Sequence, residues 1–244
     1  MAEPLGGKLV MSDDVRRARQ WLDRVDMEHE PVSEDEWATI TRARQETLTD
    51  APALFGLIKA VQYLNSRKIE GAFVECGVYR AGSALAMARQ CVLDEATDRD
   101  FYLYDTFEGC PAPTDGDGVI FGGVSATELW QQAIDDPTAA WFRETLGVAT
   151  ANIAETEYPL DNVRFVQGRV EETIPDVVPD KIALLRLDTD WYESTKHEMH
   201  HLWPRLVPGG VVVVDDYGWF ESSRKAFEEY FVETGADRPL LTRL

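Results

Sequence analysis

The chain has 244 residues, 44% of them hydrophobic, so its length suits one domain with a sizeable core. Its 44 acidic residues outnumber 24 basic ones and give a formal charge of −20, which disfavours binding to nucleic-acid phosphates or to anionic membranes. No apolar run approaches the roughly 20 residues that span a bilayer, and no N-terminal segment resembles a secretory signal, so we expect neither a nucleic-acid nor a membrane partner.

The first part of the chain, residues 1–50, is polar, charged and without strand-like runs, which predicts an N-terminal helical arm. The run Ser33-Glu-Asp-Glu36 has the form of a capping box and predicts a helix start. A second helix is expected from Asp50, with Pro52 in its first turn. The arm would therefore precede a main domain over residues 51–244.

From residue 72 the pattern alternates between apolar strand-like runs and amphipathic helical runs, which predicts an α/β fold with a mostly parallel sheet. A Gly-, Pro- and Asp-rich stretch over 108–125 predicts a long loop above the strand ends, and 239–244 reads as a short final strand. We expect strands at 72–76, 101–104, 163–166, 182–187 and 211–214, and helices near 82–95, 138–150, 192–206 and 220–234.

The three cysteines, Cys76, Cys91 and Cys110, are odd in number and lack metal-binding spacing. Two of them lie in segments that read as core elements. This usage favours a reduced, cytoplasmic setting.

The first strand ends in a glycine turn that runs from Glu75 to Ser83 and opens the next helix, where α/β folds hold nucleotide or anionic ligands. A P-loop would need a lysine directly after Gly82. A dinucleotide fingerprint would need glycine where Tyr79 stands, because that bulky side chain would block the close approach of a pyrophosphate. A nucleoside site without pyrophosphate remains, with a purely structural turn as the alternative.

The residues of this turn suit S-adenosylmethionine. Glu75 matches an amine-bearing ligand, Gly77 permits close backbone approach, and Gly82 with Ser83 provides helix N-terminal donors for a carboxylate. Asp105 ends the second strand at a spacing typical of an acid that binds ribose hydroxyls, although a strand-end turn residue is the alternative.

The adenine end of the predicted site is assigned more weakly. Gly168 and Val170 follow the third strand and could line that end, with Val170 against the base, but such residues also fill ordinary strand-to-helix turns.

Two further strands end in carboxylates, at Asp188-Thr-Asp190 and at Asp215-Asp216. Because the carboxyl ends of parallel strands border one crevice, the four acids should gather there, at an electrostatic cost that a bound cation would offset. Hard oxygen ligands favour Mg²⁺. A turn or helix-capping pair is the alternative for Asp215 and Asp216.

The segment His197-Glu-Met-His-His201 fits the H-E-x-x-H zinc pattern. A working zinc site needs a third protein ligand, and the segment reads as an amphipathic crossover helix. We therefore expect a solvated helix face and no zinc enzyme.

Four motifs, Val74–Ser83, Leu103–Gly109, Leu187–Thr195 and Pro208–Tyr217, resemble those of the macrocin O-methyltransferase family, and the likeness runs from about Thr47 to the last helix. The resemblance implies a Rossmann-like class I methyltransferase fold with helices on both faces of the sheet. It also implies magnesium held by Asp188, Asp215 and Asp216, with Asp190 as the base and Asp188 as its catalytic partner. The cofactor residues expected along the matched region are Thr49, Glu75, Cys76, Gly77, Val78, Gly82, Ser83, Asp105, Thr106, Phe107, Gly168, Val170 and Asp188.

These features together predict a Mg²⁺- and S-adenosylmethionine-dependent O-methyltransferase. Its acceptor would be a sugar hydroxyl on a glycosylated natural product or on the sugar-nucleotide precursor, in secondary-metabolite (antibiotic) biosynthesis. The resemblance further implies a homo-oligomer and an arm, residues 1–50, that encloses the acceptor. The alternatives are a metal-dependent catechol-type O-methyltransferase, an NAD-dependent oxidoreductase and a non-catalytic nucleotide-binding protein.

Overall fold

The computed structural model describes residues 27–118, 123–135 and 144–242. Its centre is a five-stranded sheet in the order β3-β2-β1-β4-β5, with every neighbouring pair parallel, as the alternating pattern predicts. The order reverses between β1 and β4, which is the position where open α/β sheets bind ligands. The strands are β1 (Ala72–Cys76), β2 (Phe101–Asp105), β3 (Val163–Gln167), β4 (Ile182–Leu187) and β5 (Leu206–Val214).

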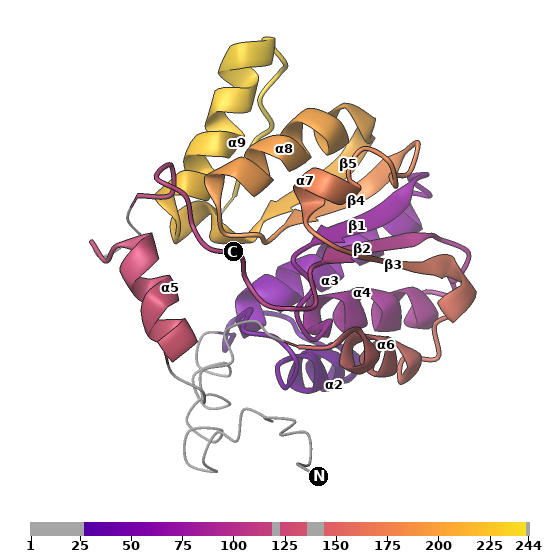
Figure 1. The fold of residues 1–244 in the computed structure, drawn as a ribbon. Coiled ribbons are helices and arrows are strands. Elements are labelled where there is room, and N and C mark those ends of the chain that lie inside the picture. The colour runs from indigo at the N-terminus through magenta and orange to yellow at the C-terminus, as the bar shows by residue number, and fades with distance from the viewer. Residues whose placement is uncertain (1–26, 119–122, 136–143, 243–244) are drawn as a thin grey trace.

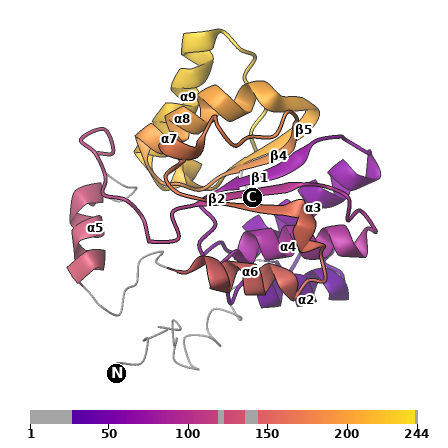
Figure 2. The same ribbon diagram turned by 45° about the vertical axis from the view of Figure 1, so that its right-hand side comes forward.

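Helices cover both faces of the sheet (Figures 1 and 2). One face carries α2 (Glu34–Ala43), α3 (Ala51–Ser66), α4 (Gly82–Leu93) and α6 (Leu146–Ala154), and the other carries α7 (Val170–Thr173), α8 (Tyr192–Leu202) and α9 (Glu221–Thr234). A further helix, α5 (Ala126–Asp135), stands to one side of the sheet. None of the described helices is both long enough and apolar enough to span a membrane.

Two hydrophobic clusters, one on each face, hold these layers together. Along the buried strand β1, Phe73 packs into the cluster under α3 and α4, while Val74 packs into the cluster under α8 and α9. Successive side chains of a strand point to opposite faces, so a parallel strand covered on both sides is apolar throughout. On β1 and β4 the exceptions are Glu75 and Arg186, which belong to the site described below.

The helix starts that the sequence predicts in the arm are confirmed. Ser33 and Glu36 form the capping box, with the amide of Glu36 donating to the Ser33 hydroxyl and the amide of Ser33 to the Glu36 carboxylate. Asp50 caps α3 by accepting a hydrogen bond from the amide of Ala53. Helix α2 contributes Ile40 to the same cluster as α3 and α4, so α2 packs on the face of the sheet that carries these helices.

The structure corrects several predicted boundaries. Residues 239–242 form no strand, because a strand needs a hydrogen-bonded neighbour and Leu240 is 98% exposed; residues 243–244 lie outside the described part. Strand β5 begins at Leu206 instead of 211, since an edge strand tolerates Pro208.

Other corrections concern helices. The helix predicted over 138–150 begins, within the described residues, at Leu146 and continues to Ala154; its predicted start lies outside them. The helix predicted over 192–206 ends at Leu202, where Trp203, Pro204 and Arg205 form a 3-10 turn. Helix α5 is not anticipated by the sequence analysis.

Candidate active site

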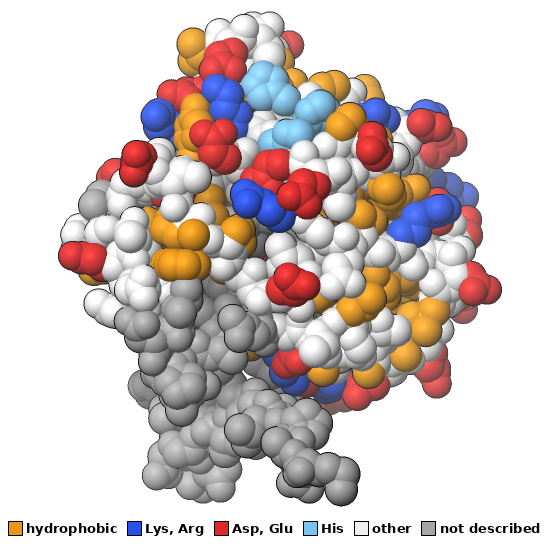
Figure 3. Space-filling model, viewed as in Figure 1, with side chains coloured by type: hydrophobic (Ala, Val, Ile, Leu, Met, Phe, Trp, Pro, Cys, Tyr) orange, Lys and Arg blue, Asp and Glu red, His pale blue; other side chains and the backbone are white. Residues whose placement is uncertain are grey.

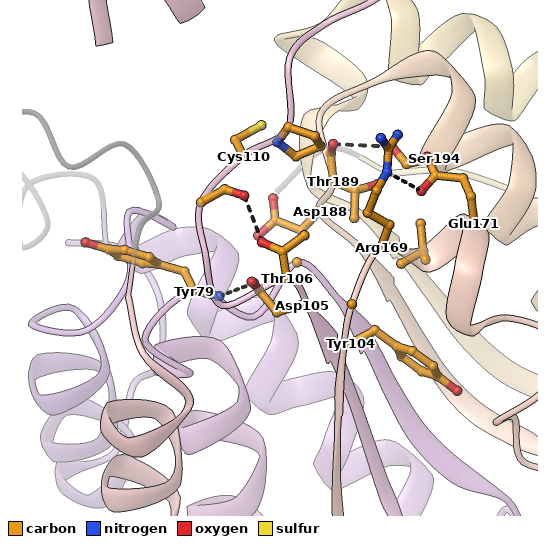
Figure 4. Close-up of a pocket in the computed structure, with 15 residues that line it drawn as sticks. Tyr79, Tyr104, Asp105, Thr106, Cys110, Arg169, Glu171, Asp188, Thr189 and Ser194 are labelled. Carbon is orange, nitrogen blue, oxygen red and sulfur yellow. Dashed lines mark hydrogen bonds and ion pairs between the residues drawn. The ribbon is translucent and has the colours of Figure 1, made fainter. Parts of the chain in front are cut away.

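A pocket opens at the carboxyl ends of the strands, between the glycine turn, the ends of β2 and β3, and the start of α8 (Figure 4). Its wall also includes the loop that follows β2, at Gly109, Cys110 and Pro111. Of the cofactor residues expected from the sequence, those that line the pocket are Gly77, Asp105, Thr106, Gly168, Val170 and Asp188.

The other expected cofactor residues do not line this pocket. Cys76 and Val78 are buried in the two core clusters, and Phe107 packs edge-on against Phe165. Gly82 contacts the end of α2, where an added Cβ would lie 2.7 Å from the carbonyl oxygen of Ala43. The hydroxyls of Thr49 and Ser83 lie 3.3 Å apart, and Glu75 is 1% exposed.

The glycine turn is tied to Asp105. One carboxylate oxygen of Asp105 accepts hydrogen bonds from the amides of Val78 and Tyr79, at 2.7 and 2.8 Å, and the other accepts from the amide of Phe107 at 2.7 Å. Burial raises the pKa of Asp105, against the lowering effect of these bonds. Asp105 therefore shapes the turn, and its contact with a ribose stays a prediction.

Tyr79 enters the pocket wall through its backbone, and its ring points away from the cavity (Figure 4). Its bulk therefore does not block a pyrophosphate, which corrects the steric argument drawn from the sequence. Its φ of 50°, with 63° at Ala81, shows that the turn holds two left-handed residues other than glycine, besides Gly77 at 85°.

The four acids meet as the sequence predicts. Asp188, Asp215 and Asp216 each present a carboxylate oxygen within 4.8 Å of the others. Asp190 joins them, because its amide donates to Asp216 at 3.2 Å. Asp190 also has a φ of 65°, a left-handed conformation uncommon for a residue with a side chain and often found at functional sites.

Arg186 stands at the centre of these acids, and sequence reasoning missed it. It is 1% exposed. Its guanidinium pairs with Glu75 at 2.6 Å, Asp188 at 2.7 Å and Asp215 at 2.8 Å, and donates to the hydroxyl of Thr49 at 2.9 Å. The available signal was an arginine inside the apolar strand 182–187, two residues before Asp188.

Burial, reinforced by mutual repulsion, raises the pKa of several of these acids. Burial raises the pKa of Asp190 to about 8, reinforced by the charge of Asp188. Burial also raises the pKa of Glu75 to about 7 despite Arg186, and that of Asp188 and Asp216 well above the usual range. One guanidinium does not neutralise the carboxylates around it. A further positive charge would therefore stabilise their ionised forms.

The loop after β2 is fastened over the acids. The indole N–H of Trp191 donates to the carbonyl of Pro111 at 2.9 Å, and the thiol of Cys110 lies 3.8 Å from the carboxylate of Asp190. Asp117, 1% exposed, accepts from the amide of Tyr192 at 2.7 Å, at the start of α8. The predicted loop over the strand ends is thus confirmed in its described part, with Asp117 as an anchor that the sequence did not reveal.

His197 and His201 of the H-E-x-x-H segment lie with ring centroids 4.4 Å apart, but among the described residues no third ligand joins them. The ring of His197 contacts the carbonyl of Ile174, and His200 contacts Glu233, on a surface where histidines gather over α8 (Figure 3). Glu198 is fully buried and accepts from the hydroxyl of Thr189 instead. Among the described residues, the one group able to hold a metal is the trio Asp188, Asp215 and Asp216.

Comparison with known proteins agrees with this geometry. The model of the macrocin O-methyltransferase family (TylF) matches residues 26–242. The chain belongs to this family. Solved relatives share the fold: the O-methyltransferase NovP has a TM-score of 0.70 at 23% identity, covering 93% of this chain and 94% of that one. The calicheamicin methyltransferase CalS11 has a TM-score of 0.61 at 18% identity, covering 99% of this chain and 93% of its own.

Three curated O-methyltransferases are similar to this chain in sequence. The mycinamicin III 3''-O-methyltransferase of Micromonospora griseorubida is 31% identical over 66% of this chain, and the match spans 61% of that enzyme. A tetracenomycin-C rhamnosyl 4'-O-methyltransferase of Streptomyces olivaceus is 29% identical over 80% of this chain and 70% of its own length. The demethyldecarbamoylnovobiocin O-methyltransferase of Streptomyces niveus is 28% identical, over 77% of this chain and 68% of its own.

Proposed function

We propose that this macrocin-family chain is an S-adenosylmethionine- and Mg²⁺-dependent O-methyltransferase that acts on a sugar hydroxyl in antibiotic biosynthesis. The observation that carries the proposal is the convergence of Asp188, Asp215 and Asp216 beside the pocket at the glycine turn. A cytoplasmic location agrees with the three free thiols, and a homo-oligomer is expected from the family resemblance.

The residues present fit both groups. Carboxylate oxygens are the ligands that Mg²⁺ prefers, and the trio offers three of them next to an excess of negative charge. For the cofactor, the turn at Gly77 brings backbone against the pocket, and Gly168 and Val170 line the same cavity at the end of β3. Glu75 bonds Arg186 and does not line the pocket, so its contact with the cofactor stays a prediction.

The chain's own residues have distinct roles in this proposal. When bound, S-adenosylmethionine would supply the methyl group and Mg²⁺ would lower the pKa of the acceptor hydroxyl. Asp190 would accept the hydroxyl proton on a carboxylate oxygen, since its amide contact with Asp216 fixes it beside the trio. The loop fastened by Trp191 and Asp117 would exclude water from the reacting atoms.

The sugar acceptor is inferred from the relatives. The tetracenomycin enzyme is named for a rhamnosyl substrate, and CalS11 is described as a TDP-rhamnose 3'-O-methyltransferase. The acceptor would therefore be a glycosylated natural product or its sugar-nucleotide precursor, enclosed in part by the arm of residues 1–50. A catechol acceptor would use the same acids, and profiling deoxysugar glycosides against catechols separates the two.

The test combines binding with activity. Calorimetry should detect S-adenosylmethionine binding, and EDTA should abolish methyl transfer that added Mg²⁺ restores. Asp190→Asn should lose about 10²–10⁴-fold in rate while it still binds the cofactor. Asp180→Asn, at an exposed position, is the control. Full activity in EDTA, with Asp188→Ala and Asp215→Ala unimpaired, would contradict the metal part of the proposal.

A further inference from the structure

We infer that Arg186 is a positioning residue that holds Asp188 and Asp215 in place for the cation. This inference rests on the proposed function, because it assigns the purpose of a contact between the arginine and two proposed metal ligands. It concerns a residue that touches neither the cofactor nor the acceptor in the proposed mechanism.

The sheet register brings the partners together. Glu75 of β1 lies opposite Arg186 of β4, which lies opposite Val213 of β5. Since alternate residues of a strand share a face, Asp188 and Asp215, each two residues further on, are directed to the side of the sheet where Arg186 lies. The three strands thus bring one arginine and its acids together beside the pocket.

The shape of the guanidinium, as well as its charge, allows it to bond all of these groups at once. One terminal nitrogen pairs with Glu75 and Asp188, and the other with Asp215 and the hydroxyl of Thr49. The Nε atom has no hydrogen-bond partner among the described residues, so these four contacts set the orientation of the group. A lysine ammonium is a compact point charge and does not reproduce a planar fork of this kind.

A positive charge beside a cation site needs an explanation. Arg186 contacts one oxygen of Asp188 and one oxygen of Asp215, so each carboxylate keeps its second oxygen for a cation. Asp216, which the arginine does not bond in this structure, adds a third ligand. Arg186 therefore limits the repulsion between the acids without occupying all their ligand atoms, which keeps the site assembled before a metal binds.

The experiment measures Mn²⁺ binding by electron paramagnetic resonance on the full chain, independently of any acceptor. Arg186→Lys keeps the charge and removes the fork, and we expect the Mn²⁺ dissociation constant to rise about 10- to 100-fold, as for other outer-shell partners of metal ligands. Arg99→Lys is the matched control, since Arg99 donates to the carbonyl of Ile69 at the amino end of the sheet and should leave Mn²⁺ affinity unchanged.

A second pair of variants covers the case in which Arg186→Lys does not fold. Thr49→Val removes a hydroxyl that orients the guanidinium and should weaken Mn²⁺ binding in the same direction by a smaller factor, whereas Thr49→Ser keeps the hydroxyl and the affinity. Circular dichroism and urea midpoints establish which variants are folded.

The outcomes separate the two proposals. If the wild type binds no Mn²⁺, the metal part of the proposed function fails. If the wild type binds and the folded variants at Arg186 and Thr49 bind equally well, only the positioning role of Arg186 is overturned.

Discussion

The carbonyl oxygen of Asp188 lies so close to Gly77 that a Cβ atom at position 77 would stand 1.8 Å from it. The amide of Asp188 also donates to the carbonyl of Cys76 at 2.9 Å, so the ends of β1 and β4 meet where the sheet order reverses. This contact joins the glycine turn to the acids, and it makes Gly77 a structural requirement of the site.

Replacing Gly77 should therefore be costly. Gly77→Ala places a side chain against backbone at a φ of +85°, so we expect a loss of roughly 2–5 kcal/mol from overpacking and left-handed strain. Urea denaturation measures this loss. Gly147→Ala, where the nearest atom to an added Cβ is 3.8 Å away, is the control and should change stability by less than about 1 kcal/mol. Equal stability of the two variants would contradict the close approach.

Glu36 should make folding stability depend on pH. Burial alone would raise its pKa, but hydrogen bonds from Lys59, the Ser33 amide and Gln62 outweigh it and lower the pKa to about 2 from 4.5. A lowered folded-state pKa stabilises the protein above the unfolded value, and this contribution is lost as pH falls from about 4.5 toward 2. Glu36→Gln should cost about 1 kcal/mol at pH 7, and its difference from wild type should shrink over that range.

Urea titrations at several pH values measure this difference. Glu34→Gln, an exposed neighbour in the same helical turn, should show little effect at any pH. A difference between Glu36→Gln and wild type that stays constant from pH 7 to pH 3 would rule out the role assigned to Glu36.

Asp117 should anchor the loop to α8. It accepts from the amide of Tyr192 and from the hydroxyl of Thr114, so it acts as a helix cap supplied from a distant loop. Asp117→Ala should lower stability by about 1–2 kcal/mol and speed amide exchange at the start of α8, measured by hydrogen-exchange mass spectrometry. Asp115→Ala, exposed in the same loop, should leave both unchanged. Unaltered exchange in Asp117→Ala would show that the loop is held by other contacts.

The histidines of α8 should be dispensable for metal binding at the acids. His201→Ala should retain wild-type Mn²⁺ affinity, because the histidine surface and the acid trio are separate groups. Elemental analysis should find no stoichiometric zinc in the purified chain. One zinc per chain that disappears in His201→Ala would instead support the H-E-x-x-H pattern.

Local patterns in the sequence predicted much of the fold. The strands, the capping box at Ser33 and the parallel arrangement follow from periodicity and short-range capping chemistry, which operate within a few residues. The final strand predicted over 239–244 was wrong where the structure describes it, because a strand exists only with a neighbour, and that is a long-range property.

The residue pattern alone places Asp188, Asp190, Asp215 and Asp216 after strand ends, and hence in one crevice. What lies between these acids follows from the three-dimensional fold. Arg186, Glu75 and Thr49 come from segments far apart in the chain, and their pairing depends on strand register and on the depth of burial. Those quantities arise from packing across the whole sheet, so no local pattern around Arg186 could specify its partners.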